Sequence, residues 1–358
     1  MVAPFSDVPS NASAGLQEQL AEIVGQLPIA EHGGLIQQIL ETLVRMIGRE
    51  ADRLDWKILN AALLDMEKGF EGFFPHRHVR KIAVFGSART PETEPDYQLA
   101  KAFSQLAAQQ GFMVMTGAGG GIMQAANEGA GLDHSFGLNI QLPFEQGAND
   151  ILEGSDRLFT FKYFFTRKLF FLKETDAIAL FPGGFGTQDE AFETLTLIQT
   201  GKSSPVPIVL IDHPDGDYWT SWDSYIRDNL LKRGLISPDD PSLYTITDNL
   251  ETAWAAITHF YRVFHSMRYV RGQLIIRLNC QLKPGGLDQL NTRFSDILMQ
   301  GKIESISALP AEKGDETEHL PRLALYFNCR DVGRLYQLIE AINDLGVPSP
   351  AIEHPEKK

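Results

Sequence analysis

The segment FPGGFGTQDE, residues 181–190, combines a glycine-rich turn with a carboxylate that could do chemistry. Thr187 and Glu190 stand three residues apart, which is the spacing of a helix capping box. The glycines are expected to supply backbone torsions that other residues disfavour. A glycine-rich turn before a helix also suits a phosphate, because free N–H groups and the positive end of the helix dipole face it. Helix rules alone favour the structural role for Glu190, and the segment leaves both roles open.

A second segment, FKYFFTRKLFFL (residues 161–172), contributes basic groups just upstream. Arg167 and Lys168 interrupt a run of phenylalanines and precede the strand that leads into the glycine-rich turn. A guanidinium near such a turn can bind a phosphate or a carboxylate in a bidentate way. A pair of solvent-exposed basic residues is the simpler interpretation. Phe164 and Phe165 are expected to help bury this helix or to form the wall of a pocket.

Two further glycine-rich turns, GSAR (residues 86–89) and TGAGGG (residues 116–121), follow short apolar runs in the same way. They make Ser87, Gly119 and Gly120 candidate ligand contacts. The second turn lacks the Lys-Ser or Lys-Thr ending of a P-loop, so P-loop ATP hydrolysis is not expected. A tight connection between a strand and a helix explains TGAGGG equally well.

The elements that must position these turns alternate between strands and helices. Short apolar runs occur at KIAVFG, FMVMTG, AIALFPGG and PIVLID, with helical stretches at residues 96–110, 122–130, 164–174 and 188–200. Strands that are apolar on both faces and alternate with helices predict a parallel sheet covered on both sides. The predicted fold class is therefore α/β, with a doubly wound Rossmann-like sheet. Such sheets bind ligands at the carboxyl ends of their strands, where the glycine-rich turns occur.

Two flanking regions extend this predicted core. Residues 1–72 are predicted to form an N-terminal helical extension, because apolar residues recur there at helical spacing. Residues 73–268 form the predicted catalytic domain, which ends in a helix over 250–266. Residues 269–358 are predicted to form a small α+β domain, ferredoxin-like or ACT-like by analogy of its β-α-β-β-α pattern. Its charged stretch PAEKGDETEHLP is predicted to be a solvated loop.

Composition narrows the possible partners. The 358 residues include 32 basic and 46 acidic side chains, a net charge of −14, which argues against general nucleic-acid binding. No stretch reaches the ~18 apolar residues of a membrane span, and the start of the chain lacks a signal-peptide pattern. A cytoplasmic location is therefore expected. Cys280 and Cys329 form no metal motif and no disulfide framework, and they are expected to be small buried hydrophobes.

These motifs resemble the LOG (Lonely Guy) family, whose members are often mislabelled lysine decarboxylases. PGGFGTQDE fits the signature PGGxGTxxE, and YFFTRK resembles the family's upstream Arg-Lys motif. The interval from Arg167 to Glu190 (190 − 167 = 23) agrees with the family's spacing. VFGSAR, GIMQAANEGA, GLNIQLPFEQ and LTLIQTGK resemble other motifs of the larger members. The resemblance spans about residues 80–265, and one departure is Gln124, where many larger members have Glu.

The resemblance implies a phosphoribohydrolase, which splits nucleoside 5′-monophosphates into a free base and ribose 5-phosphate. Its best-known substrates are N6-modified AMPs, the precursors of cytokinins, whereas larger members can act as general nucleotide 5′-monophosphate nucleosidases. Arg167 and Glu190 carry over as the catalytic pair. The resemblance implies substrate contacts from Gly184, Gly186, Thr187, Lys168 and Thr196, and from Glu145 at the nucleoside end. Gly183, next to Gly184 in the turn, is included with them. No metal and no cofactor are implied. Because members of the family form at least dimers, the resemblance also implies a homodimer or a larger homo-oligomer.

The residue types agree with that chemistry. Cleavage of the C1′–N bond builds positive charge on the ribose, which Glu190 could stabilise while it orients or deprotonates water. Arg167 would clamp the substrate and help keep Glu190 ionised. A decarboxylase that uses pyridoxal phosphate is disfavoured, because the chain contains no His-Lys dipeptide. The alternatives are a non-enzymatic carrier of a nucleotide or of the molybdenum cofactor, and a nucleotide sensor with a regulatory C-terminal domain.

Overall fold

The computed structural model describes residues 32–47, 51–142, 147–314 and 316–347, together with a few positions between 15 and 25. The chain divides into two compact units, residues 1–64 and 65–358. Helix α2 (Gly33–Ile47) lies in the first unit, and α3 (Arg53–Phe73) runs across the boundary. Both helices follow the apolar periodicity of the sequence. The domain limits drawn from the sequence stay predictions.

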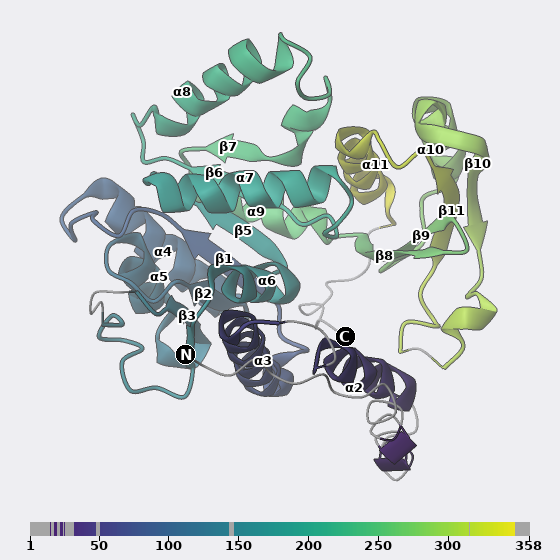
Figure 1. Ribbon diagram of the computed structural model, residues 1–358. Coiled ribbons are helices and arrows are strands. Elements are labelled where there is room, and N and C mark those ends of the chain that lie inside the picture. Colours follow the sequence, from purple (N-terminus) through teal and green to yellow (C-terminus); the bar gives the residue numbers. More distant parts are fainter. Residues whose placement is uncertain are drawn as a thin grey trace. The chain divides into compact units, whose positions relative to one another are not determined.

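The second unit is built on a parallel sheet whose seven strands have the order β4-β3-β2-β1-β5-β6-β7 (Figure 1). The strands are β1 (Lys81–Phe85), β2 (Met113–Thr116), β3 (Ser135–Ile140), β4 (Leu158–Phe161), β5 (Ala177–Leu180), β6 (Ile208–Ile211) and β7 (Thr245–Thr247). The strand order reverses between β1 and β5, so the loops after these two strands form the topological switch point. The predicted α/β class with a parallel sheet is confirmed, although β3, β4 and β7 were not among the predicted strands.

Helices cover both faces of this sheet (Figure 1). They are α4 (Pro95–Gln109), α5 (Ile122–Ala130), α6 (Phe164–Glu174), α7 (Phe185–Gln199), α8 (Tyr218–Tyr225) and α9 (Leu250–Phe260). Strand side chains alternate between two cores: Ile82 and Val84 of β1 pack with α4, α5 and α9, whereas Ala83 and Phe85 pack on the side of α6 and α7. Among the described helices, none is long and apolar enough to cross a membrane.

An antiparallel sheet with the strand order β10-β11-β9-β8 follows. Its elements are β8 (Phe264–Val270), β9 (Gln273–Leu278), α10 (Gly286–Arg293), β10 (Leu298–Ile306), β11 (Arg322–Phe327) and α11 (Val332–Leu345). The helix predicted over 250–266 is wrong at its end, because α9 stops at Phe260. Asn343 of α11 stabilises the break, since it accepts hydrogen bonds from the N–H groups of Val263 and Phe264 and donates to Phe260 O. The ferredoxin-like or ACT-like assignment stays a prediction.

Two expectations about burial fail in this C-terminal region. The charged stretch at residues 310–321 is not simply a solvated loop, because Glu312 is buried and pairs with Arg277 (2.8 Å) and Arg322 (2.9 Å). Its partners lie on β9 and β11, so the local run of charges gave no sign of them. Of the two cysteines, Cys329 is exposed and the other is partly exposed, so neither is the buried hydrophobe that was expected.

Candidate functional site

A cavity of about 830 Å³ lies at the carboxyl ends of β1 and β5, where the strand order reverses. This volume is within the usual range for small-molecule sites. Its lining comes from three strand ends and three helices: Phe85 at the end of β1, Gly86, Ser87, Ala88 and Arg89 after β1, Gly117 after β2, Met123 of α5, Arg167 and Phe171 of α6, Gly183 and Gly184 after β5, and Phe185, Gly186, Thr187, Gln188 and Glu190 of α7. The cavity therefore occupies the position that the three glycine-rich turns predict.

The start of α7 points an open helix end at this cavity. The helix begins at Phe185 with Gly184 as its N-cap, and its first bond runs from Gln188 N to Gly184 O (3.1 Å). The N–H groups of Phe185, Gly186 and Thr187 thus have no acceptor within the helix. Together with the positive end of the dipole of a 15-residue helix, they form a site for an anion.

The capping box expected for Thr187 and Glu190 is absent. The sequence predicted that the helix starts at 188, but α7 starts at Phe185, so Thr187 already lies in the first turn and Glu190 in the second. Neither side chain caps the helix, and both are buried. Glycines at 184 and 186 hid the true start, because glycine is usually read as loop. The structural explanation for Glu190 that rested on capping is therefore wrong.

The glycines of this turn provide space rather than unusual torsions. None of Gly183, Gly184 and Gly186 has a positive φ, which corrects the expected torsional role. A Cβ on Gly183 would lie 2.1 Å from Thr187 Oγ1 and 2.9 Å from Ser87 N. A Cβ on Gly184 or Gly186 would meet nothing within 4 Å. Gly183 thus allows two turns to touch, and the other two glycines keep the helix amides open to a ligand.

Arg167 and Glu190 come together at the cavity from α6 and α7. Arg167 Nη2 lies 3.5 Å from Glu190 Oε1. The guanidinium packs over the ring of Phe164, and its Nε is buried without a hydrogen-bond partner among the described residues. Burial lowers the pKa of Arg167, although Glu190 and Asp189 oppose this effect. A buried cation with an unused donor beside an open helix start is suited to hold an anion.

The charge of Glu190 depends on its neighbours. The carboxylate is only 7% exposed, and burial raises its pKa to about 7 despite the opposing effects of Lys168 and Arg167. Lys168 Nζ lies 2.8 Å from Asp189 Oδ2 and 3.9 Å from Glu190 Oε2, and it also pairs with Glu193. Burial disfavours the charged form of Lys168, but its hydrogen bonds to Asp189 and Glu193 raise its pKa. Glu190 therefore titrates near neutral pH, as a general base requires.

Several residues singled out from the sequence do not line the cavity. Lys168, expected to contact substrate, is engaged with the acids of α7. Gly119 and Gly120 belong to the turn after β2 but stand outside the lining, and Thr196 is exposed farther along α7. Glu145 lies outside the described residues.

The departure at Gln124 does not touch the cavity. Its amide donates to Glu128 (3.0 Å) and Glu92 (3.4 Å), so a neutral side chain suits a position between two acids.

The apolar wall also differs from the expectation. Phe164 and Phe165 are 50% and 53% exposed, and neither lines the cavity. Phe85, Met123 and Phe171 form the apolar part of the lining instead. The phenylalanine run gave no indication of this division, because periodicity does not say which face of a helix meets the ligand.

Arg89 and Tyr218 are further residues of the site that were not singled out from the sequence. Arg89 is exposed and lines the cavity directly after the turn that contains Ser87. Its basic charge in the GSAR motif was an available signal. Tyr218 of α8 donates to Gly183 O (2.5 Å) and accepts from Gln188 Nε2 (2.7 Å), so it ties the glycine turn to α7. No local pattern pointed to Tyr218, because it lies 35 residues from Gly183.

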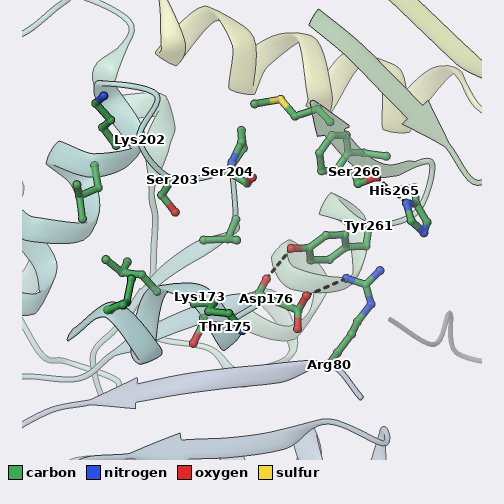
Figure 2. Close-up of a pocket in the computed structure, with 17 residues that line it drawn as sticks. Arg80, Lys173, Thr175, Asp176, Lys202, Ser203, Ser204, Tyr261, His265 and Ser266 are labelled. Atoms are coloured by element: carbon green, nitrogen blue, oxygen red, sulfur yellow. Dashed lines mark hydrogen bonds and ion pairs between the residues drawn. The ribbon is translucent and has the colours of Figure 1, made fainter. Parts of the chain in front are cut away.

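A second cavity, of about 570 Å³, is lined by residues that precede β1, β5 and β6, together with Tyr261 and the start of β8 (Figure 2). Two of its charged residues are in ion pairs: Arg80 Nη1 lies 4.0 Å from Asp176 Oδ1, and Lys173 pairs with Glu174, which does not line the cavity. Tyr261 packs under the Arg80 guanidinium and donates to Asp176 O (2.7 Å). Sheets of this class bind ligands at the opposite edge, so the first cavity is the candidate active site. Within the described ranges, no three His, Cys, Asp or Glu side chains gather to hold a metal ion.

Residues 115–257 match a family model described as "Possible lysine decarboxylase". The matched range contains α6, α7 and the whole segment from Arg167 to Glu190. Among curated proteins, none matches the chain.

Similar solved structures carry different names. The molybdenum cofactor binding protein from the phototrophic bacterium Rippkaea orientalis is 18% identical over 50% of this chain and 94% of that chain, with a TM-score of 0.36. The molybdenum cofactor carrier protein of Chlamydomonas reinhardtii is 20% identical over 50% of this chain and 96% of that chain, with a TM-score of 0.35. DNA processing protein A from Helicobacter pylori is 16% identical over 48% of this chain and 77% of that chain, with a TM-score of 0.34. Similarities at this level say nothing about the ligand or activity of this chain.

Proposed function

We propose that the first cavity hydrolyses the N-glycosidic bond of nucleoside 5′-monophosphates, with AMP or N6-modified AMP as substrates. The products are a free base and ribose 5-phosphate. The observation that carries the proposal is the pairing of Arg167 and Glu190 at 3.5 Å beside the open N-terminus of α7. The resemblance of PGGFGTQDE and YFFTRK to the LOG motifs, and the matched family model over residues 115–257, support it.

In this proposal the 5′-phosphate binds at the start of α7. The N–H groups of Phe185, Gly186 and Thr187 donate to its oxygens, and the helix dipole favours its negative charge. Gly184 leaves room for the phosphate to approach the backbone. Arg89 at the edge of the cavity adds a guanidinium that can bind phosphate in a bidentate way. A fixed phosphate holds the ribose at the right distance for reaction.

Glu190 then acts on the ribose. As the C1′–N bond breaks, its electron pair leaves with the base, and the ribose acquires positive charge that the carboxylate stabilises. Glu190 accepts a proton from water, and the resulting hydroxide forms a bond to C1′. The departing base takes up a proton from solvent, and Glu190 returns its own proton to solvent, so that one water is consumed. Arg167 clamps the substrate and, as a nearby cation, lowers the pKa of Glu190.

The site does not favour the amine chemistry that the name of the family model suggests. A Schiff-base lysine must lose its proton to attack a carbonyl, so such lysines have a lowered pKa. Lys168 is the lysine next to Arg167, and its hydrogen bonds to Asp189 and Glu193 raise its pKa. Among the described residues that line the cavity there is no lysine.

We also propose that the protein works as a homodimer or a larger homo-oligomer. Phe164, Phe165 and Leu169 form an exposed apolar surface along α6. An apolar surface of this kind beside a site is typical of protein–protein contact. Size-exclusion chromatography with light scattering measures the oligomer, and a monomer at micromolar concentration would contradict this part of the proposal.

The activity is tested by incubating the purified chain with AMP, GMP, IMP, CMP, UMP and N6-isopentenyl-AMP and measuring free base and ribose 5-phosphate. We expect release from the AMP-type nucleotides. Glu190→Gln is expected to lower kcat by about 10² to 10⁴-fold. It should keep the fold and AMP binding, because Glu190 is not a helix cap.

Glu251→Gln on the surface of α9 is the matched control and should behave as wild type. Tight nucleotide binding by the wild-type chain without any release would favour the carrier alternative. If the wild-type chain neither binds nucleotides nor releases base, the result would contradict both the hydrolase proposal and the carrier alternative.

A further inference from the structure

The start of α6 is held by a carboxylate that comes from α3. Asp65 is 3% exposed. Its Oδ2 accepts hydrogen bonds from the N–H groups of Lys162 (3.0 Å) and Tyr163 (3.3 Å) and from the hydroxyl of Thr166 (2.7 Å). Tyr163 is the N-cap of α6 and supplies no side-chain cap of its own. Asp65 therefore anchors the two residues that precede α6 and, through the Thr166 hydroxyl, the first turn of the helix.

The same part of α3 also packs against the body of α6. A Cβ on Gly69 would lie 2.2 Å from Cζ of Phe170, so the backbone of α3 touches this ring. Phe170 is fully buried, and the centroid of its ring lies 5.4 Å from that of Phe70 and 6.1 Å from that of Phe73. Because this packing leaves no free space, α6 cannot move relative to residues 65–73 without breaking contacts.

Arg167 belongs to the turn of α6 that Asp65 holds. Its N–H donates to Tyr163 O (3.2 Å), and it directly follows Thr166. Its guanidinium must reach Glu190 on another helix, at a separation of 3.5 Å. A small displacement of this first turn therefore changes the pairing at the cavity.

We propose that Asp65 is a positioning residue for Arg167, because it fixes the first turn of α6 so that the guanidinium faces Glu190 and the substrate. Asp65 does not line the cavity, so it acts through α6. The inference rests on the proposed function for its kinetic consequences. Without the Asp65 carboxylate, the N–H groups of Lys162 and Tyr163 and the hydroxyl of Thr166 lose this acceptor, and the start of α6 can shift.

The anchoring by Asp65 has a consequence that a purely structural role would not produce. Arg167 is one of the two cations that lower the pKa of Glu190. If Arg167 withdraws, the pKa of Glu190 rises above its value of about 7. The pH dependence of the reaction therefore reports whether Asp65 positions Arg167.

The test compares Asp65→Ala and Asp65→Asn with wild type, using AMP hydrolysis at temperatures well below the melting temperature of each protein. We expect Asp65→Ala to lower kcat by about 10- to 100-fold, with a smaller effect on KM, because a displaced catalytic group costs rate. The midpoint of its kcat/KM profile should move to higher pH. Asp65→Asn keeps one acceptor oxygen, so its kcat and its pH midpoint should lie between those of wild type and Asp65→Ala.

Glu67→Gln is the matched control, because it makes the same change of charge on an exposed residue of the same helix. It should leave kcat and the pH profile unchanged. An Asp65→Ala protein that melts earlier but keeps the wild-type kcat and pH midpoint would overturn the inference, since Asp65 would then only stabilise the fold. If Asp65→Ala does not fold, the same comparison is made with Asp65→Asn. An unchanged pH midpoint in that variant would also contradict the positioning role of Asp65.

A second measurement separates this inference from the proposed function. Carboxyl-carbon NMR follows the titration of Glu190 in the absence of nucleotide. If wild type hydrolyses no nucleotide, the proposed function fails. The positioning role still stands if the Glu190 midpoint rises in the Asp65 variants, and it fails if that midpoint is unchanged.

Discussion

Glu190 is buried beside two cations and two other acids, and its protonation is the net result of all of them. Burial raises its pKa from the ordinary value of 4.5 to about 7, and Lys168 and Arg167 limit the rise. The folded protein therefore holds this proton more tightly than the unfolded chain does. This contribution to stability is fully present below pH about 4.5 and is lost as the pH rises through about 7. The ionised form that the proposed hydrolysis needs is thus the form that the fold disfavours.

We expect kcat/KM for AMP to rise with pH through a midpoint near 7, because Glu190 must lose its proton before it can accept one from water. Lys168→Gln should move this midpoint upward, since Lys168 favours the ionised carboxylate more than Arg167 does. The measurement is a pH–rate profile from about pH 5.5 to 9 for both proteins.

Lys232→Gln, on an exposed lysine that pairs with Asp228, is the control for loss of a positive charge and should leave the midpoint in place. A wild-type midpoint near 4.5, or no difference between Lys168→Gln and Lys232→Gln, would contradict the role assigned to the Lys168 ammonium.

At the scale of elements, the position at which α7 begins decides what its first residues can do. A helix that started at residue 188 would place Thr187 at the cap and leave the glycines in a loop. The observed start at Phe185 instead exposes three amides to the cavity and moves Glu190 into the second turn. The turn before it must be narrow, because Gly183 packs against Thr187 and against the turn after β1.

Gly183 and Gly186 should therefore respond differently to the same substitution. Gly183→Ala places a Cβ 2.1 Å from Thr187 Oγ1, so it should destabilise the fold by about 1–3 kcal/mol and disturb the phosphate site. Gly186→Ala meets no atom within 4 Å and should keep or slightly raise stability. It should nonetheless raise KM, because its methyl group would lie at the amides to which we assign the phosphate.

Thermal unfolding and KM for AMP measure the two effects separately, and the two variants serve as controls for each other. Equal melting temperatures for both variants would contradict the packing at Gly183. An unchanged KM in Gly186→Ala would contradict the placement of the phosphate.

At the scale of the whole molecule, the parallel and antiparallel sheets share one hydrophobic core. Ile178 of β5, Ile276 of β9 and Leu335 of α11 belong to the same cluster of buried side chains. Tyr336 of α11 both donates to Val206 O (2.9 Å) and accepts from Val206 N (3.0 Å), which ties α11 to the segment before β6. Because the core is continuous, residues 65–347 are expected to unfold as one cooperative unit.

Asn343 offers the sharpest test of that cooperation. Its buried side chain makes three hydrogen bonds to the backbone between α9 and β8, so Asn343→Ala leaves three buried groups without partners. We expect a loss of about 3 kcal/mol or more in the free energy of unfolding. Urea unfolding followed by circular dichroism and by tryptophan fluorescence gives this value and shows whether the transition is single.

Asn249→Ala is the comparison, because Asn249 caps α9 through one exposed bond to Thr252 N (2.9 Å) and should cost about 1 kcal/mol. Two separate transitions in Asn343→Ala, one of which leaves the parallel sheet folded, would show that the antiparallel sheet is an independent domain.

Local sequence was sufficient where structure depends on neighbours in the chain. The helices over 122–130 and 164–174 lie where their periodicity predicts, and so do the four apolar strands closed by turns. The glycine-rich turns follow the strands at which the cavity forms. The spacing of Arg167 and Glu190 was visible as well, although only through resemblance to a family. Short strands such as β7 carried too few residues for a pattern, and β8 was absorbed into the apolar run of α9.

Tertiary structure alone decided the contacts that give these residues their properties. Asp65 reaches the start of α6 from 97 to 101 residues away, and Tyr218 reaches Gly183 from 35 residues away. Glu312 is buried because it pairs with Arg277 of β9 and Arg322 of β11. Periodicity and turn chemistry are properties of residues close in the chain. Burial, ion pairing and the pKa of Glu190 instead depend on contacts between groups that are distant in the chain, and no local sequence pattern indicates those contacts.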